Sequence, residues 1–380
     1  MKNLLLIVST GFALFSMFFG SGNLVFPLTV GKESGGHFWV ASLGIFLTGV
    51  LVPFLGVLAM TLYKGDSRQF FGSMGKPAAF WFPLVALSLM GPFGVLARCI
   101  TVAHGSFRLL FPHASLIVFS LVLCVILYLV TMNKNRIVPL LGSFLTPFLL
   151  ISLAAIAIMG FWFADSQPKF DQISFTAFKN GVFQGYQTMD LLAAFFFSTF
   201  VINHLQKRLP AGSDQTCYMK VFLKSTLLGA FLLTIVYVAL VFLGSVYAPQ
   251  LADTPPQELL GVVAYHAMGK WSAPIVCTAV VLACFTTAVV LTTLFADFLK
   301  SEVAQHKIGD STAMLVTLSI AFCVSTLEFS GISRFLGPIL ETLYPSLIVL
   351  TVLNICSSQL GWSRRRWPVA MTLLAKLCFF

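Results

Sequence analysis

The amino-acid sequence predicts an all-α polytopic membrane protein. Of its 380 residues, 58% are hydrophobic and only 9% are charged, whereas charged residues make up about 25% of a typical soluble domain. The charges are separated by long uncharged stretches, such as Gly36–Tyr63 and Ile137–Phe163, and each stretch exceeds the roughly 20 residues that span a hydrocarbon core as a helix. The alternation of polar and apolar residues that transmembrane strands require does not occur. We therefore expect a bundle of transmembrane helices.

Ten spans and a partial eleventh are predicted, with no soluble domain, so that residues 1–380 form one transmembrane domain. The first five are expected near residues 4–29, 38–63, 78–103, 114–132 and 137–163. The second five are expected near residues 181–203, 221–247, 272–299, 312–329 and 333–356, and the partial eleventh begins at residue 367. Because five is odd, the second half enters the membrane from the opposite side to the first. This arithmetic predicts two inverted repeats, about residues 4–163 and 181–356.

The basic residues indicate which side of the membrane holds the N-terminus. If it lies in the cytoplasm, the cytoplasmic segments carry most of the lysine and arginine, including Lys64, Arg68 and the run Arg364–Arg366. This bias is typical of cytoplasmic loops. The apolar start has no convincing signal-peptide cleavage site, so a retained first helix is expected. The net charge of +10 is spread over these loop clusters, and neither a nucleic-acid partner nor an obligatory protein partner is expected.

Two of the predicted spans contain residues that interrupt a helix in mid-membrane. The first contains Gly20-Ser21-Gly22-Asn23, and the sixth contains Gly185-Tyr186-Gln187-Thr188. Small residues can also serve only close helix packing, but interruptions in corresponding helices of two halves favour a binding site. Amides at the start of a half-helix would receive a carboxylate, and free carbonyls would accept from an ammonium group or hold a cation. Asn23 would bind one of these groups or cap its helix.

Other polar residues within the spans are candidates for ion binding and gating. Thr286 and Thr287 in the eighth span offer adjacent hydroxyls to a sodium ion, although threonine in a membrane helix more often bonds its own i−4 carbonyl. Arg98 and Asp190 are ionisable residues at membrane depth, and we predict an internal ion pair or gate for them. The sequence contains no histidine-rich cluster, paired intramembrane aspartates or metal-ligand spacing, so neither an enzyme nor a cofactor is expected.

Several segments, taken in order, resemble the bacterial branched-chain amino acid carriers of the sodium-coupled leucine, isoleucine and valine symporter family. The matching segments include Gly20–Pro27, Gly91–Phe93, Gly185–Asp190, Leu282–Ala288 and Leu343–Pro345. They extend over nearly the whole chain, and the string Gly-Tyr-Gln-Thr-Met-Asp at residues 185–190 is the most specific. The family looks like a branch of the amino acid–polyamine–organocation superfamily. The resemblance therefore implies a five-plus-five inverted-repeat symporter fold in which helices 1 and 6 are broken.

The resemblance also implies particular site residues. Substrate contacts are expected from the two broken helices, at Phe19, Gly20, Ser21, Gly22, Asn23, Tyr186, Gln187 and Thr188. A sodium ion is expected between the first and eighth helices, at Ser16, Phe19, Ala283, Thr286 and Thr287. The chain departs from the family around Arg98, where it reads Leu-Ala-Arg-Cys instead of Ile-Pro-Arg-Thr, with His104 near the position of a glutamate. It also ends at Phe380, within the eleventh of the twelve spans that the family usually has.

The function predicted on these grounds is secondary active import of leucine, isoleucine and valine, coupled to a sodium gradient by alternating access. The expected location is the bacterial cytoplasmic (inner) membrane, and the expected partners are the amino acid, the sodium ion and the lipid bilayer. The alternative is a proton-coupled transporter of another small neutral amino acid or solute on the same fold, in which His104 or Asp190 titrates.

Overall fold

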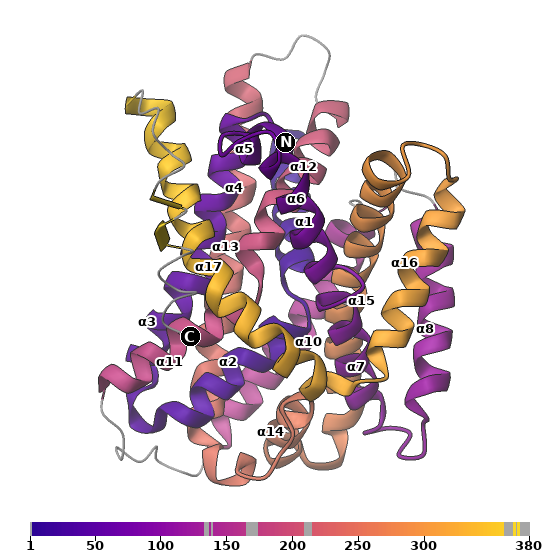
Figure 1. Ribbon diagram of the computed structural model, residues 1–380. Coiled ribbons are helices and arrows are strands. Elements are labelled where there is room, and N and C mark those ends of the chain that lie inside the picture. Colours follow the sequence, from indigo (N-terminus) through magenta and orange to yellow (C-terminus); the bar gives the residue numbers. More distant parts are fainter. Residues whose placement is uncertain are drawn as a thin grey trace.

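A computed structural model of the chain describes residues 2–132, 137, 140–164, 174–208, 215–360, 368–369 and 371–372. The helices of the first half are α1 (Lys2–Phe18), α2 (Ser21–Ser34), α3 (Phe38–Phe46), α4 (Val52–Leu62), α5 (Ser67–Gly72), α6 (Ala78–Met90), α7 (Val95–Phe107), α8 (Leu116–Thr131) and α10 (Thr146–Trp162). Those of the second half are α11 (Ser174–Gln187), α12 (Asp190–Arg208), α13 (Gln215–Val246), α14 (Leu259–Met268), α15 (Ser272–Phe298), α16 (Asp310–Ser325) and α17 (Glu328–Leu360). Most of them run between the upper and lower ends of the molecule in Figure 1.

The helical segments confirm a multi-span all-α membrane protein. Six helical runs among the described residues are long and apolar enough to cross a membrane, and the bent pair of α11 and α12 makes a seventh. Three further expected spans correspond to shorter apolar helices, Leu4–Phe18, Leu116–Thr131 and Asp310–Ser325. The run Ser21–Leu62 contains the second half of the first expected span and all of the second except its last residue. Helix therefore occurs at each of the ten expected spans.

Several details differ from the predictions. The third span is not continuous, because a turn at Gly91–Gly94 separates α6 from α7. The ninth helix ends at Ser325 and not at residue 329. The connection expected to be polar after residue 247 contains α14, which buries Leu259 and Val263. Of the partial eleventh span only residues 368–369 and 371–372 are described, and they are helical, so most of this prediction lies outside the described residues.

Among the described residues, three short π-helical segments interrupt the regular α-helical winding of the spans. They lie at Leu47–Leu51, between α3 and α4, at Leu140–Leu145, before α10, and at Leu299–Val303, after α15. Single-turn π segments inside α-helices bend the helix and shift the register of the side chains that follow.

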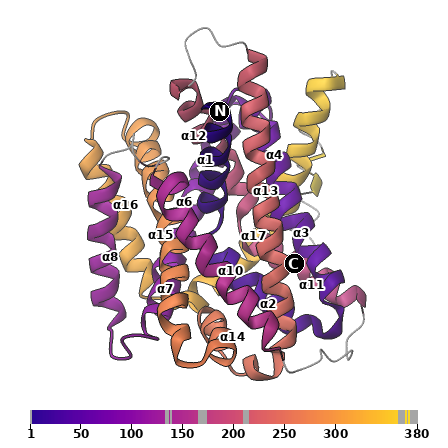
Figure 2. The ribbon, with the colours of Figure 1, turned by 180° about the vertical axis from the view of Figure 1, so that it is seen from behind.

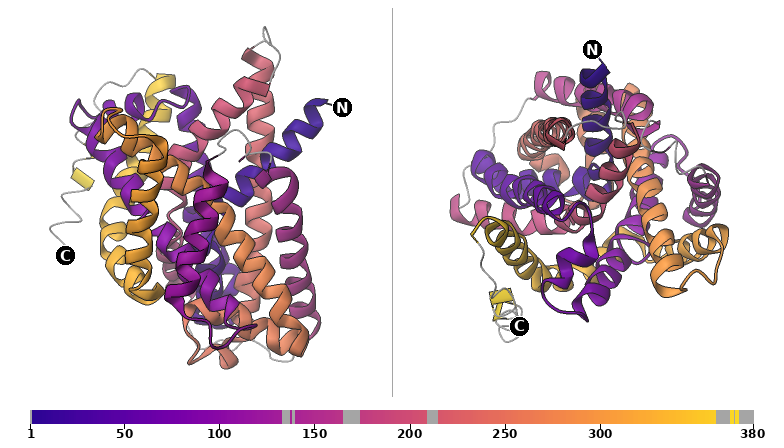
Figure 3. Two further views of the ribbon diagram at one scale, coloured as in Figure 1. Left: turned by 90° about the vertical axis from the view of Figure 1, so that its right-hand side faces the viewer. Right: turned by 90° about the horizontal axis from the view of Figure 1, so that it is seen from above.

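The outer helices turn apolar side chains outward, as contact with lipid requires. Leu129 on α8, Ile151 on α10 and Leu227 on α13 are among the large exposed hydrophobic residues. Figures 1 and 2 show α8 beside α16 at one edge of the bundle, and the view from above in Figure 3 shows them at its rim. The centre contains α15 and the break between α1 and α2, where Phe19, Thr286 and Ala283 are fully buried.

Glycines bring helices of the two halves into direct backbone contact. A Cβ atom on Gly181 of α11 would lie 2.3 Å from the carbonyl oxygen of Ala41 on α3, and one on Gly44 would lie 2.4 Å from the carbonyl oxygen of Phe178. The same reciprocal arrangement joins α2 to α13 through Gly31 and Gly244. No larger residue fits at these positions, because any Cβ would overlap the facing main chain.

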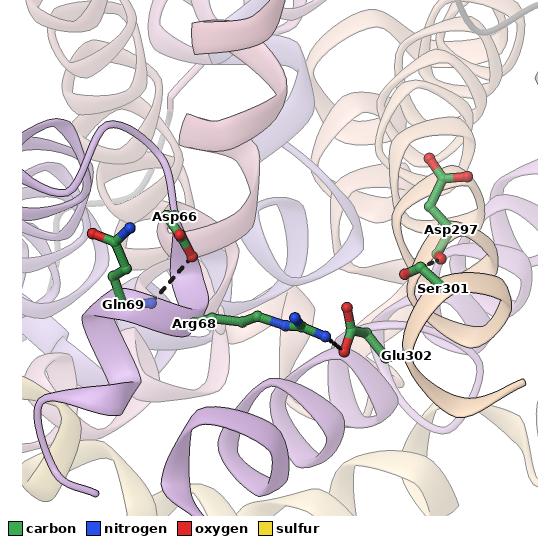
Figure 4. Close-up of polar contacts among 6 residues, drawn as sticks. All are labelled: Asp66, Arg68, Gln69, Asp297, Ser301 and Glu302. Atoms are coloured by element: carbon green, nitrogen blue, oxygen red, sulfur yellow. Dashed lines mark hydrogen bonds and ion pairs between the residues drawn. The ribbon is translucent and has the colours of Figure 1, made fainter. Parts of the chain in front are cut away.

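The upper end of the bundle in Figure 1 holds the start of α1, α5 and the ends of α12 and α15. Figure 4 shows a polar contact there: Arg68 of α5 forms an ion pair with Glu302, just beyond α15. Asp66 caps α5 by accepting a hydrogen bond from the amide of Gln69 at 3.1 Å. Because the Arg68 side chain is 63% exposed, the pair stabilises the fold by about 0–1 kcal/mol.

The α3–α11 contact generates a stability prediction. Gly181→Ala places a methyl group against the Ala41 carbonyl, and we expect it to lower the free energy of unfolding by about 1–3 kcal/mol. The melting temperature of the detergent-purified protein measures the effect. Gly72→Ala, whose added Cβ would find its nearest neighbour at 3.7 Å, is the matched control and should melt like the parent protein. Equal melting of the two variants would contradict the close packing.

Candidate functional site

The first span is broken at Phe19 and Gly20. Helix α1 ends at Phe18, and α2 begins at Ser21 after an extended Gly20 with φ −112° and ψ −156°. The Gly20 amide donates to the carbonyl of Phe18 at 2.9 Å and to Oδ1 of Asn23 at 3.3 Å. The break predicted at Gly20–Asn23 is thus present, at the start of that sequence. It leaves the first-turn amides of α2 without intrahelical carbonyl partners, as at any helix N-terminus.

The sixth span is broken at Thr188 and Met189. Helices α11 and α12 meet there at an angle of 41°. Met189 adopts a left-handed backbone conformation with φ 64°, which is unusual and strained for a residue other than glycine. The Thr188 hydroxyl donates to the carbonyl of Gly185 at 2.8 Å, and so ties the break to the last turn of α11. The interruption predicted within Gly185–Thr188 therefore lies at the end of that segment.

The two breaks lie against each other. A Cβ on Gly22 of α2 would be 3.3 Å from Cα of Thr188. At the next residue, Nδ2 of Asn23 donates to Oδ2 of Asp190 at 2.7 Å and to the hydroxyl of Tyr237 at 2.6 Å. The Tyr237 hydroxyl in turn donates to the same Asp190 oxygen at 2.9 Å. All three side chains are at most 2% exposed, so this network links α2, α12 and α13 in the interior.

The side-chain amide of Asn23 has hydrogen-bond partners for both its nitrogen and its oxygen. Its amide nitrogen is bonded to Asp190 and Tyr237, and its amide oxygen accepts from Gly20. The capping role foreseen for Asn23 is therefore observed as a hydrogen bond back to the residue before α2. Tyr237 was not among the predicted site residues. The only signal in the sequence is a hydroxyl-bearing residue within the apolar seventh span.

The predicted cation ligands of the first and eighth spans converge. The Thr286 hydroxyl donates to the carbonyls of Ser16 at 2.9 Å and Ala283 at 3.0 Å. The Thr287 hydroxyl lies 3.4 Å from the carbonyl oxygen of Ser16 and 3.1 Å from that of Met17. Four of the five predicted ligands thus meet where α15 packs on the end of α1, and Met17 adds a carbonyl that was not predicted.

Uncharged oxygens of this kind suit a hard monovalent cation better than a transition metal. Within the described part of the chain, no group of three or more His, Cys, Asp and Glu residues could hold a metal ion. The fifth predicted ligand, Phe19, lies in the break itself, and its ring stacks on that of Phe15 with centroids 5.1 Å apart.

The other predicted substrate contacts at the two breaks differ in burial and in the residues they contact. Ser21 is fully buried, and its hydroxyl lies 3.6 Å from the thiol of Cys99 on α7. Tyr186 is half-buried, and its ring lies 5.1 Å from that of Tyr344 on α17. The Tyr344 hydroxyl accepts from the amide of Leu191 at 3.1 Å, which satisfies a first-turn amide of α12.

Arg98 and Asp190 are both buried, as predicted, but they have different partners. Arg98 donates from Nη1 to the carbonyl of Gln187 at 3.1 Å and from Nη2 to its side-chain oxygen at 3.4 Å. Asp190 is bonded to Asn23 and Tyr237. Among the ion pairs of the described residues, none joins Arg98 to Asp190. The two residues lie on either side of the α11–α12 break, and a gating role for them stays a prediction.

A stability prediction concerns the buried network. Tyr237→Phe leaves Asn23 and Asp190 each without one hydrogen-bond partner, and we expect the free energy of unfolding to fall by about 1–3 kcal/mol. Thermal melting in detergent measures the loss. Tyr265→Phe on α14 is the control, because Tyr265 is 58% exposed and its substitution should not change the melting temperature. A Tyr237→Phe protein as stable as the control would show that the network does not support the breaks.

Comparisons with known proteins agree on one family. A sequence model of the family described as branched-chain amino acid transport protein matches residues 3–379. The chain is 28% identical over 382 residues to the branched-chain amino acid transport system 3 carrier protein of Pseudomonas aeruginosa, over 98% of this chain and 85% of that protein. It is 29% identical over 380 residues to the branched-chain amino acid permease BrnQ of Escherichia coli, with the same coverage of 98% and 85%.

Solved structures with the same fold come from other transporters. MhsT in complex with L-phenylalanine matches with a TM-score of 0.64 at 14% identity, over 97% of both chains. The inward-facing conformation of Mhp1 matches with a TM-score of 0.60 at 15% identity, over 92% of this chain and 77% of that one. A manganese transporter of Eremococcus coleocola matches with a TM-score of 0.56 at 15% identity, over 98% and 84%. At these identities the likeness concerns the fold alone.

Proposed function

The chain belongs to the branched-chain amino acid transport protein family, and from this premise we propose that it imports leucine, isoleucine and valine in symport with sodium ions. The members of this family are transporters, so the chain is a membrane carrier and not an enzyme. The proposal therefore concerns how the substrate is held, which ion drives transport and in which direction it proceeds.

The substrate is proposed to bind at the two helix breaks. The residues concerned are Phe19, Gly20, Ser21, Gly22 and Asn23 of the first break and Tyr186, Gln187 and Thr188 of the second. Half-helix ends offer amides and carbonyls to the amino acid head group, and the rings of Phe19 and Tyr186 offer an apolar surface to its side chain. Selection among the three substrates is expected to be weak, because one methylene in an apolar pocket is worth about 1–3 kcal/mol.

The observation that carries sodium coupling is the convergence of Thr286 and Thr287 on the carbonyls of Ser16, Met17 and Ala283, at 2.9–3.4 Å. The hydroxyls bond these carbonyls directly. A cation placed among the same atoms would take the carbonyl and hydroxyl oxygens as ligands. Because α15 and the end of α1 each supply part of the set, an ion there would hold the first break against α15. Its binding would thereby depend on the conformation of the transporter.

Alternating access is proposed to rest on two inverted repeats, about residues 4–163 and 181–356. The breaks support this division, since each lies in the first helix of its half. We also propose that the end of the bundle holding the start of α1 and α5 faces the cytoplasm of a bacterial inner membrane. That end carries Lys64 and Arg68, as well as Lys300 just beyond α15, as the distribution of basic residues in membrane proteins favours.

The direct test is uptake of labelled leucine into proteoliposomes with and without an inward sodium gradient. Uptake should accumulate leucine above its external concentration only with the gradient, and unlabelled isoleucine and valine should compete. Equal accumulation under a potassium gradient would refute sodium coupling and leave the carrier assignment intact. No uptake of any of the three amino acids by folded protein would refute the substrate assignment.

The cation site predicts a change in sodium dependence. Thr286→Ala combined with Thr287→Ala removes two oxygen ligands, and the sodium concentration for half-maximal uptake should rise at least about tenfold, the loss of about 1.4 kcal/mol of ion binding. Thr293→Ala is the control on the same helix, because the Thr293 hydroxyl bonds only its own helix at Val289 in the described structure. Unchanged sodium dependence in the double variant would return both threonines to helix packing.

Proton coupling is the alternative, and the burial of Asp190 favours it. This carboxylate is 2% exposed and takes part in no ion pair among the residues described, so a proton could neutralise it. His104, the other titratable candidate, is held at the end of α7 by a 2.9 Å hydrogen bond with the carbonyl of Ala114. Leucine uptake driven by an inward proton gradient without sodium, and lost in Asp190→Asn, would establish this alternative.

A further inference from the structure

A buried positive charge beside the second break has no anionic partner in the part of the chain that the structure describes. Arg98 on α7 is 1% exposed, and no ion pair of the described residues includes it. An isolated arginine at membrane depth is costly and points to a function. The two phenyl rings that flank it, Phe26 at 5.4 Å and Phe329 at 5.7 Å from Cζ to the ring centroid, stabilise the cation but do not neutralise it.

The hydrogen bonds of Arg98 leave one edge of its guanidinium group open. Nη1 is bonded to the main-chain carbonyl of Gln187 at 3.1 Å. Among the described residues, Nη2 makes only a long contact of 3.4 Å with the Gln187 side chain, and Nε is buried without any hydrogen-bond partner. Nε and Nη2 form the edge of a guanidinium group that binds a carboxylate through two parallel hydrogen bonds.

This open edge belongs to a side chain that contacts both broken helices. Gln187 is the last residue of α11 before the break, and Phe26 lies on α2, which begins at the other break. The next residue of α7, Cys99, places its thiol 3.6 Å from the hydroxyl of Ser21 in the first turn of α2. Arg98 therefore lies next to the residues proposed to hold the amino acid.

Two other donors for a carboxylate in this region are already engaged. The Gly20 amide is bonded to Phe18 and Asn23. The amide nitrogen of Asn23 is bonded to Asp190 and Tyr237. A carboxylate entering the site would have to break these bonds to use either group, whereas Nε of Arg98 is free.

We propose that Arg98 binds the carboxylate of the transported amino acid through Nε and Nη2, and that Gln187 holds the guanidinium group in position before the substrate arrives. This inference rests on the proposed function, because it assigns one group of the substrate at the same site. It gives Arg98 a direct ligand in place of the gating role expected from the sequence. The main-chain contact of Nη1 with Gln187 is kept, and the long Nη2 contact is replaced by a shorter, charge-assisted one.

The proposal predicts which leucine analogues compete. Leucinamide keeps the ammonium group and side chain but has no carboxylate, and it should bind the wild-type protein at least about thirtyfold more weakly than leucine, as expected for an unpaired buried charge. 4-Methylpentanoate keeps the carboxylate and side chain without the ammonium group, and it should compete with leucine. Equilibrium binding of labelled leucine to detergent-purified protein, with each analogue as competitor, measures both.

The decisive variant is Arg98→Gln, which removes the charge and keeps a polar side chain facing Gln187. Leucine should then bind at least about thirtyfold more weakly, while leucinamide binding should change little, so that the variant no longer distinguishes the two compounds. It should also lose competition by 4-methylpentanoate. Arg108→Gln is the matched control: Arg108 is exposed and pairs with Glu258, and both affinities should stay at the wild-type values.

Several outcomes would overturn the proposal. One is an Arg98→Gln protein that still prefers leucine to leucinamide by the wild-type ratio, because Arg98 would then only position Gln187. Another is wild-type protein that binds leucinamide as tightly as leucine, a result that decides the matter even if the variant does not fold. Arg98→Lys provides a second variant with the charge but without the two-donor edge, and it should show an intermediate ratio. Failure of the wild-type protein to bind leucine at all would instead refute the proposed function.

Discussion

The need to satisfy every backbone amide and carbonyl inside the bilayer governs this structure. A helix can be interrupted in lipid only where other protein groups take up the hydrogen bonds that the break releases. Here each break has side chains that bond its own backbone, and a side-chain network joins the two breaks. Asn23 accepts from the Gly20 amide before α2 and donates to Asp190 at the start of α12. Tyr237 holds both side chains from α13. Loss of any of the three would leave buried polar groups unpaired beside the proposed site.

The charges around the second break follow from the same constraint. Arg98 lies at the carbonyl end of α11 and Asp190 is the first residue of α12. Each sign is the one that the adjacent helix end favours, since a helix carries partial negative charge at its C-terminus and partial positive charge at its N-terminus. The arginine and the aspartate therefore compensate the two ends of one broken helix and do not pair with each other.

Hydropathy and helix-breaking residues sufficed to predict the spans and the two breaks, because each is a local property of the chain. The threonine pair stood out only as adjacent hydroxyls, and its proposed role as a cation site came from the family resemblance. Other features depend on contacts between distant residues. Tyr237 is 214 residues away from Asn23 in the sequence, yet the two side chains are hydrogen-bonded. No local pattern identifies a tyrosine in an apolar span as the partner of Asn23 and Asp190. The carbonyl of Met17 joins the proposed cation ligands because of how α15 packs on the end of α1. The turn after α6 begins at Gly91-Pro92 and was not predicted. Proline alone does not identify such a turn, because Pro83, Pro338 and Pro345 lie inside helices. Of the ion pair or gate expected for Arg98 and Asp190, the ion pair is not seen among the described residues. A residue's depth in the membrane does not reveal which neighbour its side chain faces.

The reciprocal glycines of α2 and α13 restrict how the molecule can move. A Cβ on Gly31 would lie 2.0 Å from the carbonyl oxygen of Val241, and one on Gly244 would lie 2.3 Å from that of Leu28. Each main chain thus packs against a glycine of the other helix. If one helix slid along its neighbour, its carbonyl oxygens would clash with the side chains next to that glycine. Shear between these two helices is blocked. If these helices move during transport, the pair α2–α13, and by the same geometry the pair α3–α11, would turn as rigid units, and the hinges would fall at the adjoining non-helical residues Phe19–Gly20 and Thr188–Met189.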